Sequence, residues 1–321
     1  MKKDFFQNFN NLNGGGIAFS IMMMVYVFVS FLGQTLVGAI FGTESVSYTA
    51  ICSCFSALTM LITLSLFKFN TGEKLLSLTR IKPFKWYFSL VAIVLSAAMF
   101  FGLGFVNDAL VRVFEKFGVV LKGIEVPLDN VGQYIVFSVV LGLLPAVFEE
   151  IFFRGLIIKL LDGAKPVYVI IAVALCFSLY HCSAAQFAYQ LVYGALLTLL
   201  ALAAKSSIPS IIAHFINNFA VITLQYFNIS INLYHVASII SGTLVLAGIT
   251  ALLFLILNKN KNTANNKITA DNKRAVVNNG TANGGEVKKF GWFYAFASMG
   301  IIICVALMLG TIITSLSGGM V

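Results

Sequence analysis

Long apolar runs alternate with short polar connections along most of the chain. A helix needs about 20 apolar residues to cross a hydrocarbon core of roughly 30 Å, so the longest runs are predicted to span a membrane. None of them shows the alternating pattern typical of a membrane β-barrel strand. The pattern therefore predicts an all-α, polytopic transmembrane helical bundle of about eight to nine spans, at 17–41, 47–67, 87–107, 131–160, 166–183, 186–204, 208–228, 236–257 and 291–316.

Two segments depart from this apolar pattern. Residues 107–125 mix charged residues with valines and phenylalanines, which predicts an amphipathic helix at the membrane surface. Residues 258–290 are rich in Asn, Lys and Thr and have few apolar residues to bury, which predicts a disordered cytoplasmic linker.

The composition fixes the class of protein. Of the 321 residues, 59% are apolar and only 10% are charged, whereas a soluble domain has about 25% charged residues. So few charges cannot cover the surface of a 34.9 kDa globule. A soluble enzyme, a disordered chain and a nucleic-acid-binding module are therefore excluded, and an integral membrane protein is predicted.

The basic residues predict the orientation. With the N-terminus in the cytoplasm, the cytoplasmic ends carry most of the Lys and Arg residues, and the opposite ends carry only Arg112, Lys116 and Lys122. The formal net charge of +9 then reports topology and contact with anionic lipid headgroups, and requires no nucleic acid. The cytoplasmic set is Lys2, Lys3, Lys68, Lys74, Arg80, Lys82, Lys85, Lys159, Lys165, Lys205, Lys259, Lys261, Lys267, Lys273, Arg274, Lys288 and Lys289.

Three ionisable residues lie inside the apolar run 131–160, where charges are costly. Glu150 and Arg154 are four residues apart and share a helix face, so they are expected to pair. Glu149 points about 100° away from that face and is left for another partner. A buried ion network without a chemical role is the alternative interpretation, because buried pairs are not reliably functional.

Two of the three histidines also lie at or in predicted spans, and they favour a reactive centre. His181 ends the fifth span, and His214 shares a helix face with Asn218 on the seventh. Folding the fourth and fifth spans as a hairpin brings His181 within a helical turn of Glu149. Counting residues along the helices places His214 about 10 Å nearer the cytoplasm than Glu149 and His181. Helix tilt, or a turn at residues 208–209 that lies below the membrane surface, would close this gap.

These residues carry a resemblance to a known family. Glu149-Glu150-Ile-Phe-Phe-Arg154 resembles the EExxxR motif of the CAAX protease and bacteriocin-processing (CPBP) family of intramembrane endopeptidases. The sequence from Phe177 to His181 resembles that family's FxxxH motif, and His214 to Asn218 its HxxxN motif. The resemblance covers about residues 140–220, and three motifs in order on successive spans make it specific.

The resemblance implies roles for these residues. Glu149 and His181 would activate a water for attack on a peptide carbonyl. His214 and Asn218 would bind a metal or stabilise the oxyanion, while Arg154 would hold Glu150 in register. His181, His214 and Glu149 also make a plausible ligand set for a divalent metal such as Zn²⁺ with an open position, and the choice between the two chemistries stays open.

The implied organisation places a catalytic core at 131–228. The N-terminal spans and the amphipathic segment precede it at 1–130, and a further span at 229–257, the linker at 258–290 and a last span at 291–321 follow it. The implied substrate is a membrane-tethered peptide or protein. In the plasma membrane of a bacterium, which the Asn/Lys-rich linker favours, peptide processing or bacteriocin immunity is expected in place of prenylated clients.

Two other classes of function compete with a protease. One is a non-catalytic scaffold or bacteriocin-immunity protein of the same fold, which the intact motifs disfavour. The other is a transporter or channel whose Glu, His and Arg residues relay protons. The charges cluster in one contiguous third of the chain, whereas a transporter built from inverted repeats would distribute them over paired halves.

Overall fold

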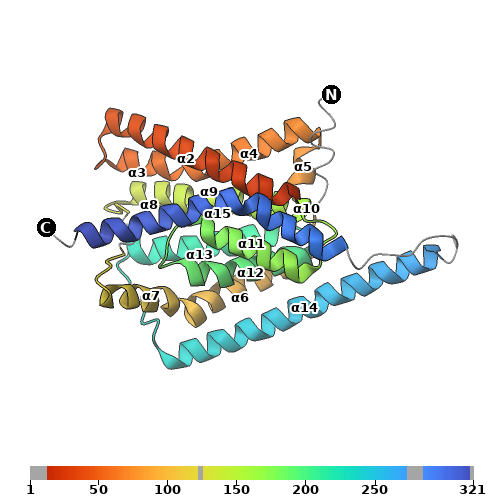
Figure 1. Ribbon diagram of the computed structural model, residues 1–321. Coiled ribbons are helices and arrows are strands. Elements are labelled where there is room, and N and C mark those ends of the chain that lie inside the picture. The colour runs from red at the N-terminus through yellow and green to blue at the C-terminus, as the bar shows by residue number, and fades with distance from the viewer. Residues whose placement is uncertain (1–12, 122–125, 273–284, 319–321) are drawn as a thin grey trace.

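The computed structural model describes residues 13–121, 126–272 and 285–318, and these residues form helices and connecting loops without strands. Figure 1 shows most of the helices running in roughly one direction across the bundle. The elements are α2 (Asn13–Phe41), α3 (Val46–Ser53), α4 (Phe55–Thr71), α5 (Leu75–Leu78), α6 (Tyr87–Leu103), α7 (Phe105–Lys116), α8 (Val131–Phe137), η1 (Ser138–Leu143), α9 (Leu144–Glu150), η2 (Ile151–Ile157), α10 (Ile158–Leu160), α11 (Pro166–Tyr180), α12 (Phe187–Ala204), α13 (Ile208–Tyr226), α14 (Val236–Asn272) and α15 (Gly285–Gly318).

Eight helices in the described residues are long and apolar enough to cross a membrane, which confirms the predicted all-α polytopic bundle. The remaining predicted span, the fifth at 166–183, is α11 and has 15 residues. At 1.5 Å per residue it is about 22 Å long, shorter than the hydrocarbon core of a typical bilayer. His181 follows directly where this short helix ends.

The fourth predicted span is one continuous helical stretch, Val131–Leu160, but it is not uniformly α-helical. Asn130 caps its first turn by accepting a hydrogen bond from the backbone N–H of Gln133 at 3.0 Å. Two π-helical segments, η1 and η2, then flank the seven-residue α9, which ends at Glu149 and Glu150. Because π-helical turns are rare and occur frequently at functional sites, this irregularity marks the same residues as the charges do.

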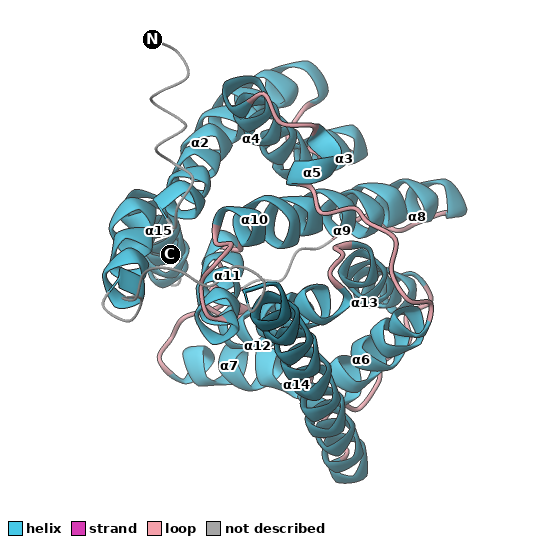
Figure 2. Ribbon diagram, turned by 90° about the vertical axis from the view of Figure 1, so that its right-hand side faces the viewer, coloured by secondary structure: helices cyan, strands magenta, loops and turns pink. Residues whose placement is uncertain are grey.

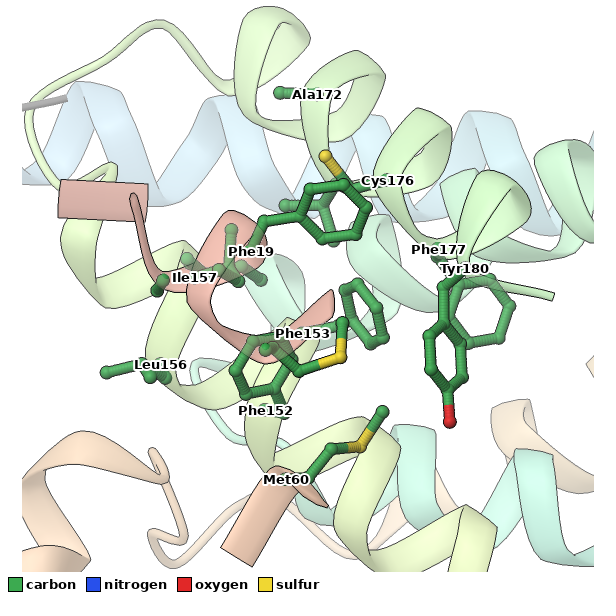
Figure 3. Close-up of a cluster of buried hydrophobic side chains, with 14 of the residues drawn as sticks. Phe19, Met60, Phe152, Phe153, Leu156, Ile157, Ala172, Cys176, Phe177 and Tyr180 are labelled. Carbon is green, nitrogen blue, oxygen red and sulfur yellow. The ribbon is translucent and has the colours of Figure 1, made fainter. Parts of the chain in front are cut away.

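Two buried apolar clusters hold the bundle together. The first joins α2, α4, η2, α11 and α15, and Figure 3 shows Phe152, Phe153 and Phe177 gathered there beside Phe19 and Met60. The second joins α6, α12, α13 and α14. The fourth span, whose η2 segment belongs to the first cluster, packs against α13, which belongs to the second. The two clusters therefore meet where the fourth span and α13 are in contact.

Small residues bring the outer helices close together. An added Cβ on Gly242 of α14 would lie 2.5 Å from the backbone nitrogen of Gly102 on α6. An added Cβ on Gly300 of α15 would lie 2.8 Å from a ring carbon of Phe19 on α2. Close approach at small residues is the usual way in which membrane helices pack.

The structure corrects the predicted linker at 258–290. Residues 258–272 continue α14 as helix, residues 273–284 lie outside the described residues, and α15 begins at Gly285. Extending an existing helix is far easier than nucleating one, and the chain contains no Gly or Pro between Gly248 and Gly280. In Figure 1, the α14 helix projects beyond the rest of the bundle.

The segment predicted to lie on the membrane surface is a helix over part of its length. Helix α7 covers Phe105–Lys116 and contains no buried residue, as expected of an amphipathic segment. Its Arg112 guanidinium carbon lies 5.0 Å from the centre of the Tyr234 ring. Lys122 and the other residues of 122–125 lie outside the described residues.

Candidate functional site

A fully buried ion pair lies at the centre of the site. The Arg154 Nη1 atom donates to Glu150 Oε1 at 2.7 Å, and neither side chain is exposed to solvent. The four-residue spacing predicts this pair, and the structure confirms it. Arg154 also donates from Nη2 to the Gly194 carbonyl at 3.0 Å, and its guanidinium carbon lies 4.2 Å from the centre of the Phe177 ring. Residues from three elements, α9, α12 and α11, therefore contact the guanidinium group that η2 carries.

Gly194 allows this arrangement because it has no side chain. An added Cβ would lie 3.0 Å from a ring carbon of Phe177 and 3.2 Å from the Ala174 Cα atom, so α12 and α11 are already in contact there. The Gly194 carbonyl accepts a second hydrogen bond from the Thr198 hydroxyl at 2.7 Å. A buried carbonyl with two donors is well satisfied, and it fixes the position of Arg154.

His214, on α13, lies next to both carboxylates. Its Nδ1 atom lies 2.9 Å from Glu150 Oε1, the same oxygen that Arg154 contacts. Its Nε2 atom lies 3.9 Å from Glu149 Oε2, which is beyond hydrogen-bonding distance. That Glu149 oxygen is buried and has no hydrogen-bond partner. Glu150 Oε2 is also buried without a partner. The two adjacent carboxylates differ in what holds them, because Arg154 and His214 contact Glu150 Oε1 whereas no hydrogen bond among the described residues holds Glu149.

A sunken turn closes the depth gap that residue counting leaves for His214. In the connection between α12 and α13, Lys205 is exposed, but Ser206 and Ser207 have no exposed surface. The hydroxyl groups of these two serines donate to a distant part of the chain, such as Ser206 to the Lys82 carbonyl at 2.8 Å. Because α13 begins below the surface of the bundle, His214 reaches the level of the carboxylates within two turns.

His181 lies immediately after the end of α11. Its Nδ1 atom lies 2.8 Å from the Phe177 carbonyl, which can only accept, so Nδ1 carries the hydrogen and Nε2 is the atom left for other contacts. The Phe177 ring contacts both histidine rings, with centroid distances of 4.8 Å to His181 and 5.9 Å to His214. No hydrogen bond or ion pair among the described residues joins His181 to Glu149 or to His214 directly.

Asn218 faces the first π-helical segment. Its Nδ2 atom donates to the Leu141 carbonyl in η1 at 3.3 Å. The neighbouring Asn217, which the motif does not include, is buried and accepts a hydrogen bond from the Tyr189 hydroxyl at 3.0 Å. Asn217 and Tyr189 are the polar pair that sequence reasoning misses, and the doubled Asn in the HxxxN segment is the one signal that points to it.

The predicted metal ligands do not form a ligand set in this arrangement. Nowhere in residues 13–121, 126–272 and 285–318 do three His, Cys, Asp or Glu side chains lie together in a way that could hold a metal ion. His214 already uses Nδ1 for Glu150, and His181 uses Nδ1 for the Phe177 carbonyl. The divalent metal stays a prediction.

The fold and the site together define a class: a polytopic helical membrane protein with a buried Glu–Arg–His centre. Comparison with known families finds a match for the segment that contains this centre. Residues 131–220 match a family described as "Type II CAAX prenyl endopeptidase Rce1-like". The match contains all six predicted site residues, covers less than a third of the chain and confirms the resemblance carried by the three motifs. No curated protein and no solved structure matches the chain. The bundle therefore has an Rce1-like core, preceded and followed by helices that this match leaves out.

Proposed function

We propose that the protein is an intramembrane endopeptidase that hydrolyses a peptide bond of a membrane-tethered peptide or protein. One observation supports it above the others: Glu149 has a buried oxygen without a partner, 3.9 Å from His214 Nε2. A buried polar atom that makes no hydrogen bond is costly. Such an atom is expected where a water or a substrate group binds during the reaction.

The two carboxylates divide the work in this proposal. Glu150 has a supporting role, because Arg154 and His214 both contact its Oε1 atom. Glu149 is the general base. The 3.9 Å between Glu149 Oε2 and His214 Nε2 is less than twice a hydrogen-bond length, so one water would form a hydrogen bond to both atoms in this proposal.

In the proposed reaction, this water is the nucleophile. Its oxygen attacks the peptide carbonyl, its proton passes to Glu149, and a tetrahedral oxyanion forms. Asn218 uses one amide hydrogen for the Leu141 carbonyl and has a second one for the oxyanion. His214 donates to the same oxyanion from Nε2 when its ring carries both protons. Glu149 then returns the proton to the leaving nitrogen and the C–N bond breaks, which releases a carboxylic acid and an amine. The acid then gives its proton to the amine or to water.

His181 completes the proposed centre from α11. With Nδ1 bound to the Phe177 carbonyl, its Nε2 atom is free to accept a hydrogen bond from the attacking water. This role requires the water to lie between α11 and α9. The proposal therefore assigns water activation to Glu149 and His181, and oxyanion stabilisation to His214 and Asn218.

The test is cleavage of a panel of membrane-tethered peptides by the purified protein in vesicles. Glu149→Ala and His181→Ala are expected to abolish cleavage, whereas Glu44→Gln, which changes an exposed carboxylate in the α2–α3 loop, is expected to leave it unchanged. Cleavage that survives both alanine variants would refute the catalytic assignment.

Two further readouts separate the alternatives. Protection of cells against a bacteriocin that persists in both alanine variants would support a scaffold or immunity protein. If the reaction uses no metal ion, treatment with a chelator is expected to leave the cleavage rate unchanged. Loss of activity on chelation, reversed by Zn²⁺ or another single metal ion, would instead establish the metal-dependent mechanism.

A further inference from the structure

A loop outside the Rce1-like match joins the two helices that carry the proposed catalytic groups. It comprises residues 73–82, between α4 and α6, and we refer to it as the 73–82 clamp. Figure 2 shows the chain after α5 passing the fourth span and α13 on its way to α6. The clamp contacts the fourth span on one side and the α12–α13 turn on the other.

On the fourth span, the clamp binds at two points. Lys159 forms an ion pair with Glu73 and donates to the Ser77 hydroxyl at 2.6 Å. One turn earlier, Gly155 lies against the clamp backbone, since an added Cβ would lie 2.6 Å from the Thr79 carbonyl oxygen. Gly155 directly follows Arg154, so this contact lies one residue from the buried ion pair.

On the α12–α13 turn, three hydrogen bonds join the clamp to two serines. The Ser207 hydroxyl donates to the Thr79 carbonyl at 2.9 Å, and its backbone N–H donates to the Arg80 carbonyl at 3.1 Å. The Ser206 hydroxyl donates to the Lys82 carbonyl at 2.8 Å. Ser207 precedes α13 and lies seven residues before His214. Three carbonyl groups within four residues of the clamp therefore hold the α12–α13 turn.

The clamp itself is anchored in the protein interior. Leu78 is 1% exposed and Thr79 is 3% exposed. Arg80 has a φ of 53°, a left-handed conformation that costs a non-glycine residue roughly 1 kcal/mol or more. This bend turns successive carbonyls toward the serines, and a strained residue persists only where its surroundings determine it. The clamp is therefore packed against the rest of the protein and has a defined backbone conformation.

We propose that the 73–82 clamp is a positioning element that sets the separation between Glu149 on the fourth span and His214 on α13. The proposal rests on the proposed function of these two residues. Ser207 and Gly155 are the positioning residues, since they connect the clamp to the two catalytic helices. A shift of about 1 Å in such a centre can lower a rate by about 100-fold, so a contact distant from the reacting atoms still affects turnover.

The experiment measures cleavage of a tethered peptide by the full-length protein in vesicles, expressed per folded molecule. Ser207→Ala removes the hydroxyl that binds the Thr79 carbonyl and is expected to lower kcat roughly 10-fold with KM unchanged. Ser206→Ala is expected to act in the same direction, and Ser207→Thr, which retains a hydroxyl, is expected to restore most of the rate.

Ser210→Ala is the matched control. Ser210 is equally buried, three residues after Ser207 in the first turn of α13. Its hydroxyl also donates to a backbone carbonyl, but that carbonyl belongs to Leu197 on α12. Its kcat is expected to stay within about twofold of the wild type, because the clamp contacts remain. Equal losses in Ser207→Ala and Ser210→Ala, or an unchanged kcat in Ser207→Ala and Ser206→Ala, would overturn the proposal.

Hydrogen exchange separates failure of the clamp from failure of the proposed function. If the wild type cleaves no peptide, the proposed function fails while the clamp can still be tested. Ser207→Ala is then expected to increase exchange in the segments that contain Glu149 and His214, and Ser210→Ala is not. An increase confined to residues 79–82 would show that the loop does not control the geometry of the centre.

Discussion

The polar centre and the outer helix contacts hold this bundle together by opposite means. At the centre, Glu150, Arg154 and His214 are joined by directional contacts of 2.7 and 2.9 Å. At the outer contacts, α14 meets α6 and α15 meets α2 through small residues, as at Gly102 and Gly242. The first kind of contact fixes the orientation of chemical groups, whereas the second fixes only the distance between helices. Changes at the centre should therefore affect function and stability together, and changes at the outer contacts should affect stability alone.

The largest effect is expected from Arg154→Met. It removes the cation that neutralises Glu150 in a site without solvent exposure, and breaking a buried pair on one side costs about 3–5 kcal/mol. The free energy of unfolding in mixed micelles measures this loss. The double variant Glu150→Gln, Arg154→Met removes both charges and should recover part of it. A single variant as stable as the wild type would mean that the pair contributes no stability.

A smaller effect is expected at the contact between α6 and α14. Gly242→Ala places a Cβ 2.5 Å from the Gly102 backbone nitrogen, and such overpacking costs about 1–3 kcal/mol. Gly248→Ala on the same helix is the control, because an added Cβ there meets nothing within 4 Å. The folded fraction of Gly242→Ala should cleave substrate at the wild-type rate. A loss of kcat in that fraction would show that the outer contacts affect function as well as stability, as the centre does.

The smallest effect is expected from Glu73, whose pair with Lys159 is partly exposed. Partial burial would raise the pKa of the Glu73 carboxyl, but hydrogen bonds from Lys159 and Ser77 outweigh it and lower this pKa below its ordinary value. The stabilisation is therefore fully present above the ordinary glutamate pKa of about 4.3 and is lost as the pH falls through the folded-state value.

Glu73→Gln tests this sign. At pH 7 the variant should be less stable than the wild type by about 0.2–1 kcal/mol, and at about pH 3 the difference should vanish. Thermal unfolding of both proteins across this range measures it. A difference that grows on acidification would show that the ion pair does not lower the pKa of Glu73.

Much of the fold can be predicted from the sequence, because membrane spans are long apolar runs. The pair of Glu150 and Arg154 can also be predicted, since it depends on spacing within one helix. The contact between His214 and Glu150 cannot, because its depth depends on a turn that backbone carbonyls of a distant loop hold in place. Because every residue has a backbone carbonyl, the sequence does not show which of them accepts a hydrogen bond. The π-helical segments around α9 and the helical residues 258–272 were missed because neither has a strong local sequence signal.

The account depends most on Glu149 as the general base, and Glu149→Gln tests it most directly. The substitution preserves the shape of the side chain and removes its basic oxygen. With an unchanged thermal midpoint to show that the protein is folded, cleavage of a tethered peptide should fall by about 100- to 10,000-fold, the usual contribution of a general base. Cleavage by Glu149→Gln at the wild-type rate would contradict the proposed mechanism.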